Sequence, residues 1–302
     1  MALTIDSQTT KVSSLEEYRE YVANRVNVRD LDSVCSSADQ LKALANNRTF
    51  LIEHFNQSLR DWRNFQLANS YTAQTLLLGS GPDFVIRANI WTPLTNDVTL
   101  RAEQKRLFVY DVPHDHNFSF LTVGYFGPGY ETTIYEYDPG RVTGKIGEKV
   151  ELRFLETTTL PTGKIMLYRM SRDVHTQNYP ENFSISLNLL LAPPETNQRE
   201  QFLFDLESSR IAQYARNTAS TRLMMCRVAR YIGNARTATL LDELASGHSS
   251  ARVRLTATES LAMLEPSCGS RIWSRATEDE SPVVREYAVK QLERDTTTGS
   301  IS

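Results

Sequence analysis

A run of short β-type segments between Tyr71 and Pro193 constrains the fold of this chain more than any other feature. Each segment is rich in β-branched and aromatic residues, and Gly, Pro, Asn and Asp separate it from the next. About eight such segments at near-regular spacing are typical of an antiparallel sandwich or closed barrel. The segments expected to be strands are 72–78, 84–91, 106–112, 118–126, 131–137, 150–156, 164–170 and 184–191.

The residues before these strands carry helical signals. Ser14 and Glu17 form a capping-box pattern (S-x-x-E), which predicts a helix that continues to about Val26. A longer helical pattern spans about residues 37–67, with an expected break near Asn46-Asn47, and its apolar residues lie on one stripe.

After about Phe202 the pattern is helical to the end and contains an internal repeat. Val253, Arg254, Ala257 and Leu261 recur 31 positions later as Val284, Arg285, Ala288 and Leu292. The motif V-R-x-x-A-x-x-x-L resembles HEAT-like repeats over roughly residues 219–294, which implies a short α-solenoid. The polar tail DTTTGSIS is expected to be disordered. We therefore expect an N-terminal helical region that packs on a β-barrel, the barrel itself, and a helical-repeat region with its tail, over residues 1–70, 71–200 and 201–302.

The residues that most clearly carry chemistry are His114-Asp115-His116 and His175, in a chain that has only five histidines. Alternate side chains of a strand point the same way, so His114 and His116 can face one cavity. A third imidazole from a neighbouring strand would complete one face of a metal's coordination sphere. Asp115 would point away from the pair, either as a turn or surface residue or as a group that orients an imidazole. Imidazole suits Fe, Zn, Cu and Ni, so ligand type alone leaves the metal open.

These histidines and the turn Pro161-Thr162-Gly163 resemble the cupin superfamily over about residues 106–191. The resemblance implies a double-stranded β-helix, that is, a cupin-type antiparallel barrel. Many cupins carry a Glu soon after the His-x-His pair, whereas the first carboxylate here is Glu131, beyond the turn Gly127-Pro128-Gly129. Without that Glu, the set resembles the three-histidine cupins, such as thiol dioxygenases of the cysteine dioxygenase type. That resemblance implies a metal with open positions for substrate and O2.

Fe(II) is therefore the expected metal, with Zn, Ni and Cu as alternatives. An added 2-oxoglutarate is not favoured, because enzymes that use it need a cation for its far carboxylate. No Lys or Arg occurs between Thr176 and Gln198, although Lys105, Lys164 or Arg169 could supply one from another strand.

Other residues of the β region suit proton transfer and substrate binding. Phenols and carboxylates can hold or donate a proton, so the expected catalytic residues are Tyr130, Glu131 and Tyr168. Guanidinium groups clamp carboxylates, and the polar face of segment 184–191 could contact a substrate. The expected substrate-binding residues are Arg87, Arg101, Arg169, Ser184, Ser186 and Asn188.

Composition narrows the classes of partner and compartment. The formal net charge of -3 gives no global basic field, so neither nucleic acid nor an anionic membrane is an expected partner. The three scattered cysteines favour a reducing compartment. The polar N-terminus is unlike a signal peptide, and no apolar run is long enough to span a bilayer. A cytoplasmic protein is expected.

These features together predict a mononuclear non-haem iron oxygenase, a dioxygenase or hydroxylase, that acts on an amino-acid-like or peptide substrate. One alternative is a cupin isomerase or epimerase that uses Zn or Ni as a Lewis acid, with Glu131 or a Tyr as base. Another is a non-catalytic protein that senses a ligand or binds a protein. The helical repeats could bind a protein partner, pack on the barrel or form a homodimer contact.

Overall fold

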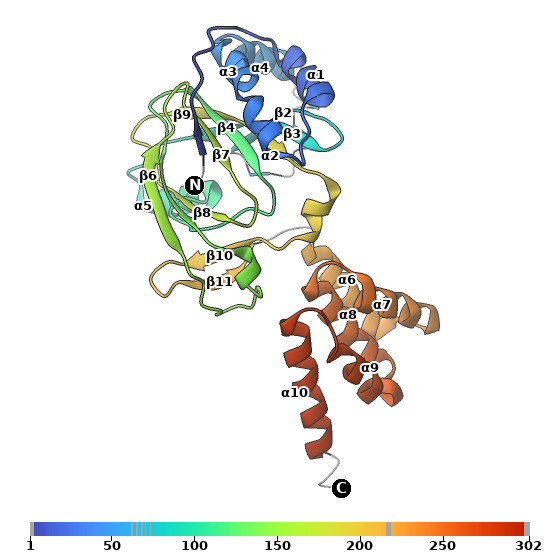
Figure 1. Cartoon of the computed structure of the whole chain (residues 1–302). Coiled ribbons are helices and arrows are strands. Elements are labelled where there is room, and N and C mark those ends of the chain that lie inside the picture. Colours follow the sequence, from blue (N-terminus) through green and yellow to red (C-terminus); the bar gives the residue numbers. More distant parts are fainter. Residues whose placement is uncertain are drawn as a thin grey trace. The chain divides into compact units, whose positions relative to one another are not determined.

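The computed structural model describes residues 3–61, 63–64, 66–67, 69, 71–72, 74–215 and 219–298 (Figure 1). The chain forms two compact units. The β unit contains Met1–Pro139, Glu151–Thr196 and Leu203–Ser209, so the N-terminal helices and most of the strands share one unit. The helical unit contains Gly140–Val150, Asn197–Phe202 and Arg210–Ser302.

The N-terminal helices of the β unit begin and end largely where the sequence predicts. Ser14 caps the first helix, because its Oγ accepts from the backbone N of Glu17 at 3.2 Å while Ser14 N donates to the Glu17 carboxylate at 2.7 Å. The break expected near Asn47 is also present, since Asn47 ends one helix and its side chain accepts from Phe50 N, at the start of the next. The pattern of residues 37–67 ends early, and its described residues after Asp61 form turns. The elements are β1 (Leu3–Ile5), α1 (Leu15–Arg25), α2 (Leu31–Ser36), α3 (Ala38–Asn46) and α4 (Phe50–Arg60).

Two antiparallel sheets form most of the rest of the β unit. The larger one has six strands in the order β1-β7-β4-β9-β3-β2, and the smaller one has three in the order β6-β5-β8. Besides β1, the strands of the larger sheet are β2 (Thr75–Ser80), β3 (Phe84–Trp91), β4 (Phe120–Phe126), β7 (Ile165–Tyr168) and β9 (Ser184–Leu191). Those of the smaller sheet are β5 (Glu131–Glu136), β6 (Arg153–Thr159) and β8 (Asp173–Gln177).

The two faces of the larger sheet differ in chemistry. One face carries fully buried aliphatic side chains, among them Ile86, Leu121 and Leu189, which form one core with Tyr18 of α1 and Leu41 of α3. Figure 1 shows these helices gathered against the sheet. Because successive residues of a strand face opposite sides, the residues between the aliphatic ones face the other way, and several of those are polar.

One predicted strand is wrong. The segment 106–112 instead begins with the last residues of helix α5 (Val98–Phe108). Asp97 caps this helix by accepting from the backbone N of Thr99 and Leu100. The helix ends at Val109, which takes a left-handed conformation with φ of 55°. The run RLFVYDV has the composition of a strand. A helix that begins at the N-cap Asp97, eight residues before Lys105, nevertheless continues into this run.

The helical unit contains a repeated hydrogen-bond arrangement that matches the sequence repeat. Arg254 Nη1 donates to the carbonyls of His248 and Ser249, and Arg285 Nη1 donates to the equivalent carbonyls of Asp279 and Glu280. Ala257 and Ala288, also equivalent, are completely buried. The helices are α6 (Ala219–Ile232), α7 (Ala235–Gly247), α8 (Ala251–Leu264), α9 (Gly269–Ala276) and α10 (Pro282–Thr298).

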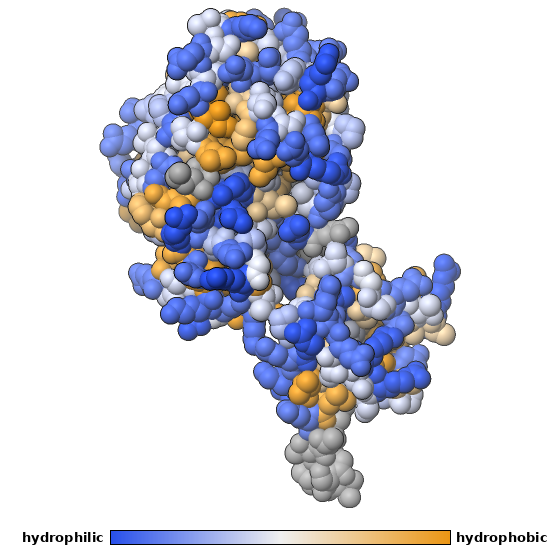
Figure 2. Space-filling model, in the orientation of Figure 1, coloured by the Kyte–Doolittle hydropathy of each residue, from blue (hydrophilic) through white to orange (hydrophobic). Residues whose placement is uncertain are grey.

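Two further observations concern the ends and connections of these units. The tail expected to be disordered begins as helix, because α10 continues to Thr298, and residues 299–302 lie outside the described residues. The pattern expected to be helical from about Phe202 begins instead with two short strands that pair with each other, β10 (Phe202–Asp205) and β11 (Arg210–Tyr214). Among the residues described, no helix combines the length and the hydropathy needed to cross a membrane. The surface in Figure 2 is mostly hydrophilic, with hydrophobic side chains exposed in separate places.

Glu136, at the end of β5, is held by Arg153 of β6 and by Arg169, which lies between β7 and β8. Arg153 Nε and Arg169 Nη2 donate to its carboxylate at 2.9 and 2.8 Å. The hydrogen bond from Arg153, followed by that from Arg169, lowers the pKa of Glu136 from 4.5 to about 2. Since the folded state binds this proton more weakly than the unfolded state, the contribution to stability is present above about pH 4.5 and is lost as the pH falls toward 2.

We expect Glu136→Gln to lower the free energy of unfolding at pH 7 by about 1 kcal/mol, a value kept small because Arg153 is largely exposed. The difference from the wild type should shrink between pH 4.5 and pH 2, as measured by urea unfolding across this range. Glu156→Gln is the control, since no salt bridge of Glu156 is seen in the described structure. A variant of Glu136 that matches the wild type at every pH would contradict this role.

Candidate metal centre

His114 and His175 are joined through their backbones. His114 N donates to His175 O at 3.0 Å, and His175 N donates to His114 O at 2.9 Å. This is the reciprocal pairing of an antiparallel ladder, in which the two opposed side chains lie on the same side. The sequence predicts a strand that carries His114 and His116. His114 belongs to no regular strand and forms only an isolated bridge. The segment is nevertheless extended, because Asp111 N donates to Gln177 O and Ser171 N donates to His116 O on either side of the pairing.

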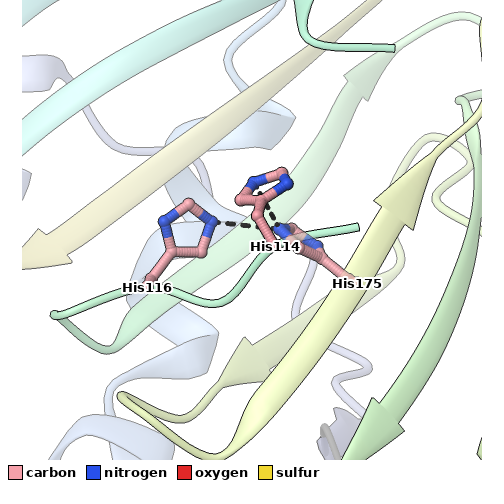
Figure 3. Close-up of side chains that lie close together, drawn as sticks. All are labelled: His114, His116 and His175. Carbon is pink, nitrogen blue, oxygen red and sulfur yellow. Dashed lines mark hydrogen bonds between the residues drawn. The ribbon is translucent and has the colours of Figure 1, made fainter. Parts of the chain in front are cut away.

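The three imidazoles converge through their Nε2 atoms (Figure 3). His175 Nε2 lies 3.0 Å from His116 Nε2 and 3.2 Å from His114 Nε2. No other group of three or more His, Cys, Asp or Glu side chains within the described residues is arranged to hold a metal ion. Two nitrogens bound at about 2.1 Å to one ion and at right angles to each other are roughly 3.0 Å apart. The two separations from His175 Nε2 therefore fit neighbouring positions around a single ion, and the three ligand atoms all lie within 4.8 Å of one another.

Hydrogen bonds between the three imidazoles cannot satisfy all of their Nε2 atoms at once. His114 Nδ1 lies 2.8 Å from the carbonyl of Val112, and it donates there if it carries the hydrogen, which leaves His114 Nε2 as an acceptor. A hydrogen on His175 Nε2 can point at only one of its two neighbours, so at least one pair of nitrogens lacks a hydrogen between them. A cation at the point of convergence would satisfy all three lone pairs.

The environment keeps the imidazoles neutral. Burial lowers the pKa of His114 below 6.5, although the Val112 carbonyl opposes this. Burial holds the pKa of His116 and His175 well below 6.5, and the neighbouring His114 and Arg87 lower it further. Neutral imidazoles are the form that binds metal. The site is thus prepared to bind a cation at neutral pH.

Asp115 points away from the imidazoles, as expected, but it is not on the surface. It is completely buried, and its Oδ2 accepts from the hydroxyl of Tyr137 at 2.7 Å. The phenol of Tyr137 packs against the ring of Phe204. This contact fixes the residue between the two histidines, so Asp115 acts as a positioning residue for both of its neighbours.

Aromatic rings surround the imidazoles on the other side. The ring of His116 lies 4.8 Å from Phe118 and 5.0 Å from Phe120, and Tyr168 stacks on Phe120 at 4.7 Å. The ring of Tyr168 is also 4.7 Å from that of His175. These contacts place the inner face of β4 and β7 against the histidines. They also make the surroundings of the three Nε2 atoms largely apolar.

A row of polar side chains crosses this same inner face. Arg87 on β3 is opposite Asn188 on β9, which in turn is opposite Thr122 on β4. Thr122 is two residues from Phe120 and therefore shares its face. Each of the three residues is buried, and Arg87 Nε, Asn188 Nδ2 and Thr122 Oγ1 make no hydrogen bond in the described structure. Buried polar atoms usually have partners, so this row has the character of a binding surface.

Two predicted catalytic residues lie in the same interior. Tyr130 is buried and stacks on Trp91 at 3.8 Å. Burial raises the pKa of Tyr130 and of Tyr168 above 10. The hydroxyl of Tyr168 is buried and makes no hydrogen bond among the described residues. Both phenols therefore stay protonated at neutral pH and can donate a hydrogen bond or a proton.

The structure places the other predicted residues elsewhere or occupies their polar atoms. Glu131 is exposed and accepts from Asn178 Nδ2 at 2.7 Å, on the face of β5 opposite to Thr132 and Ile134. Arg101 is exposed on α5 and donates to Thr95 O. Arg169 is engaged by carboxylates, since it donates to Asp173 and Glu136. Two buried serines hold structure: Ser184 Oγ accepts from Gly129 N, and Ser186 Oγ accepts from Trp91 Nε1 at 3.0 Å.

Sequence reasoning missed two residues of the interior. Gln177 lies beside His175, with its Nε2 3.4 Å from His175 Nε2, and Thr132 is opposite Gln177 on β5. Thr132 Oγ1 is buried and makes no hydrogen bond in the described structure. The two-residue period from His175 could have identified Gln177. Nothing local identifies Thr132, because its position depends on the pairing of β5 with β8.

We expect replacement of His114, His116 or His175 by Ala to weaken the binding of a divalent metal by more than roughly 100-fold, beyond the loss typical of an outer-sphere change. The folded state should persist, because each substitution removes a buried ring whose polar atoms lack full satisfaction. Titration calorimetry with Fe(II) or Co(II) and metal analysis of the purified variants would measure this. His54→Ala and His248→Ala, which change histidines on helical segments, should leave affinity unchanged. Equal loss in these controls would contradict the assignment.

Comparison with known proteins gives weak similarities. No protein-family model and no curated protein sequence matches the chain. Hydroquinone 1,2-dioxygenase from Sphingomonas sp. TTNP3 with 4-hydroxybenzoate bound is similar at 12% identity and a TM-score of 0.28, over 42% of this chain and 70% of that one. A conserved protein with a double-stranded β-helix domain from Klebsiella pneumoniae subsp. pneumoniae MGH 78578 is similar at 10% identity and a TM-score of 0.25, over 44% and 86%. A salicylate 1,2-dioxygenase from Pseudaminobacter salicylatoxidans is similar at 10% identity and a TM-score of 0.24, over 47% and 32%. At these values the similarities assign neither a family nor an activity to this chain.

Proposed function

We propose that this protein is a mononuclear non-haem iron oxygenase whose metal is held by His114, His116 and His175. The observation that carries the proposal is the convergence of three neutral Nε2 atoms, with His175 3.0 and 3.2 Å from the other two. Three imidazole ligands would leave other coordination positions of the ion for substrate and O2. Fe(II) bound in this way supplies electrons for the activation of O2.

The donor set alone does not separate iron from the alternatives. No carboxylate or thiolate belongs to the three-histidine group among the described residues. Zn, Ni and Cu also bind imidazole, and metal analysis distinguishes them. The isomerase alternative loses Glu131 as a candidate base, because Glu131 is exposed and bonded to Asn178, and a Tyr remains as the other candidate. Added 2-oxoglutarate is not part of the proposal.

The residues of the chain supply positioning and shielding. Phe118 and Phe120 pack against His116 and exclude water from one side of the site. Tyr168 holds a proton on a phenol close to His175, since burial raises the pKa of Tyr168. A phenol in this position can donate a hydrogen bond to a reacting oxygen of the substrate.

The first experiment asks whether the bound metal has open positions. We expect the protein loaded anaerobically with Fe(II) to bind one ion per chain. It should then give the electron paramagnetic resonance signal of a ferrous nitrosyl complex when nitric oxide is added as a substitute for O2. Absence of that signal in fully loaded protein would indicate a closed, structural site. A ligand-sensing protein would bind small molecules without consuming O2, which an oxygen electrode measures.

We also propose that the substrate carries a carboxylate or a similar anion, which Arg87 binds. The residue is 8% exposed, its Nε makes no hydrogen bond, and no salt bridge of Arg87 is seen within the described structure. Its Cζ lies 5.0 Å from the ring centre of Tyr71, and burial lowers the pKa of Arg87. Asn188 offers an adjacent amide donor. A buried cation without a counter-ion is costly, and an anionic substrate would supply that counter-ion.

We expect Arg87→Met to raise the free energy of unfolding by about 1 kcal/mol, because it replaces a buried unpaired charge by an apolar chain of similar length. Benzoate should raise the melting temperature of metal-loaded wild type more than benzamide does, and this preference should disappear in the variant. Arg101→Met, on exposed α5, is the control. A destabilised Arg87 variant that keeps the preference for benzoate would show that the arginine is structural.

We also propose a closed barrel for the β region and a solenoid for the helical region. The two sheets of the β unit would close into a cupin-type barrel within residues 71–200, with His175 on the smaller sheet and Arg87 on the larger one. The equivalent contacts of Arg254 and Arg285 support a short solenoid of HEAT-like repeats within residues 201–302. A peptide or a small molecule would enter the barrel as substrate.

A further inference from the structure

Helix α6 has two apolar faces, only one of which is covered. Leu223 and Cys226 are buried, and Cys226 packs with Leu241 and Ala257 in the core of the helical unit. The other face carries five apolar residues whose exposed fractions lie between 46% and 79%. They are Met224, Met225, Val228, Tyr231 and Ile232. A helix that is apolar on both sides is normally buried on both sides. We call these five residues the α6 patch.

The patch is hollowed at its end. Met225, Val228 and Ile232 line a cavity of about 390 Å³ together with Gly233 and Thr237 at the start of α7. Met263 of α8 is 52% exposed and is joined to α6 by Arg230, whose Nη1 lies 3.4 Å from its Sδ. Methionines on exposed surfaces adapt to the shape of bound peptides. A groove lined in this way can take a side chain from an opposing helix.

The charges on α6 and on the first half of α7 have one sign. Residues 219–241 contain four arginines and no acidic residue, although the chain as a whole has a net charge of -3. Arg222, Arg227 and Arg236 are exposed. Arg230 Nη2 donates to the Tyr231 hydroxyl at 2.9 Å, which keeps that guanidinium at the edge of the patch. The rim is therefore complementary to acidic side chains.

We propose that the α6 patch binds an amphipathic helix with an acidic polar face, supplied by another protein. The apolar face of such a helix would cover the patch, and its carboxylates would meet the arginine rim. A second copy of this chain is disfavoured, because pairing α6 with itself would bring the arginines together without acidic partners. The groove beside Gly233 favours an inserted side chain over a lipid surface. This proposal is independent of the metal centre.

The test uses the full chain and a fluorescent peptide of about five helical turns, with Leu on one face and Glu on the other. We expect it to bind at least about tenfold more tightly than a peptide of the same composition in permuted order. Replacing its Glu by Lys should abolish binding. Val228→Glu and Ile232→Glu should each weaken binding by about tenfold or more. Val289→Glu is the matched control, because Val289 is exposed to a similar extent on α10.

The possible outcomes separate the alternatives. The melting temperature of each variant verifies folding, and exposed positions should leave it unchanged. Equal binding of the ordered and permuted peptides, or equal loss in Val289→Glu, would overturn the proposal. So would a dimer, seen by light scattering, that Ile232→Glu dissociates. Binding to phosphatidylcholine vesicles with about 30% phosphatidylserine, if lost in Ile232→Glu while the peptide fails to bind, would assign the patch to a membrane surface instead.

Discussion

Two backbone hydrogen bonds between His114 and His175 are the constraint on which the candidate site depends. They join residues 61 positions apart and set the distance between their imidazoles without any metal. His116 then follows from His114 through the alternation of an extended chain, while Asp115 turns inward to Tyr137 and anchors the segment. A site fixed by main-chain pairing keeps its ligands in place before the ion arrives, so little ordering entropy opposes metal binding.

The larger sheet serves stability on one face and binding on the other. Its aliphatic face forms a continuous core with the N-terminal helices, which is the burial that holds the β unit together. Its opposite face carries Arg87, Asn188 and Thr122, whose polar atoms lower stability as long as they lack partners. The two roles separate because strand side chains alternate, and β9 shows both: Leu187 and Leu189 face the helices, while Asn188 faces the histidines.

Sequence patterns correctly predicted the elements that are determined by residues close together in the chain. The capping box at Ser14, the break at Asn47 and most of the strands follow from residue type and spacing. The strand expected over 106–112 failed because its apolar residues lie at the end of a helix that begins at a distant N-cap, Asp97. The sequence also grouped the three histidines but could not show that Glu131 faces outward, since that depends on how β5 pairs with β8. Long-range register decides which polar residues share an interior.

The hydrogen-bond partners of two buried arginines, Arg254 and Arg87, support the proposal that a ligand binds the row of Arg87, Asn188 and Thr122. Arg254, in the helical unit, is 4% exposed, and all its donor nitrogens are used: Nε and Nη2 bind Asp279 at 2.8 Å, and Nη1 donates to two carbonyls. Arg87 is buried to a similar degree, yet its Nε makes no hydrogen bond and no carboxylate forms a salt bridge with it in the described structure. The same chain thus satisfies one buried guanidinium fully and leaves the Nε of the other without a partner in the described structure. A fold that needed Arg87 only for packing would gain by an apolar side chain at that position, so the unpaired Nε supports the proposal that an anion binds there.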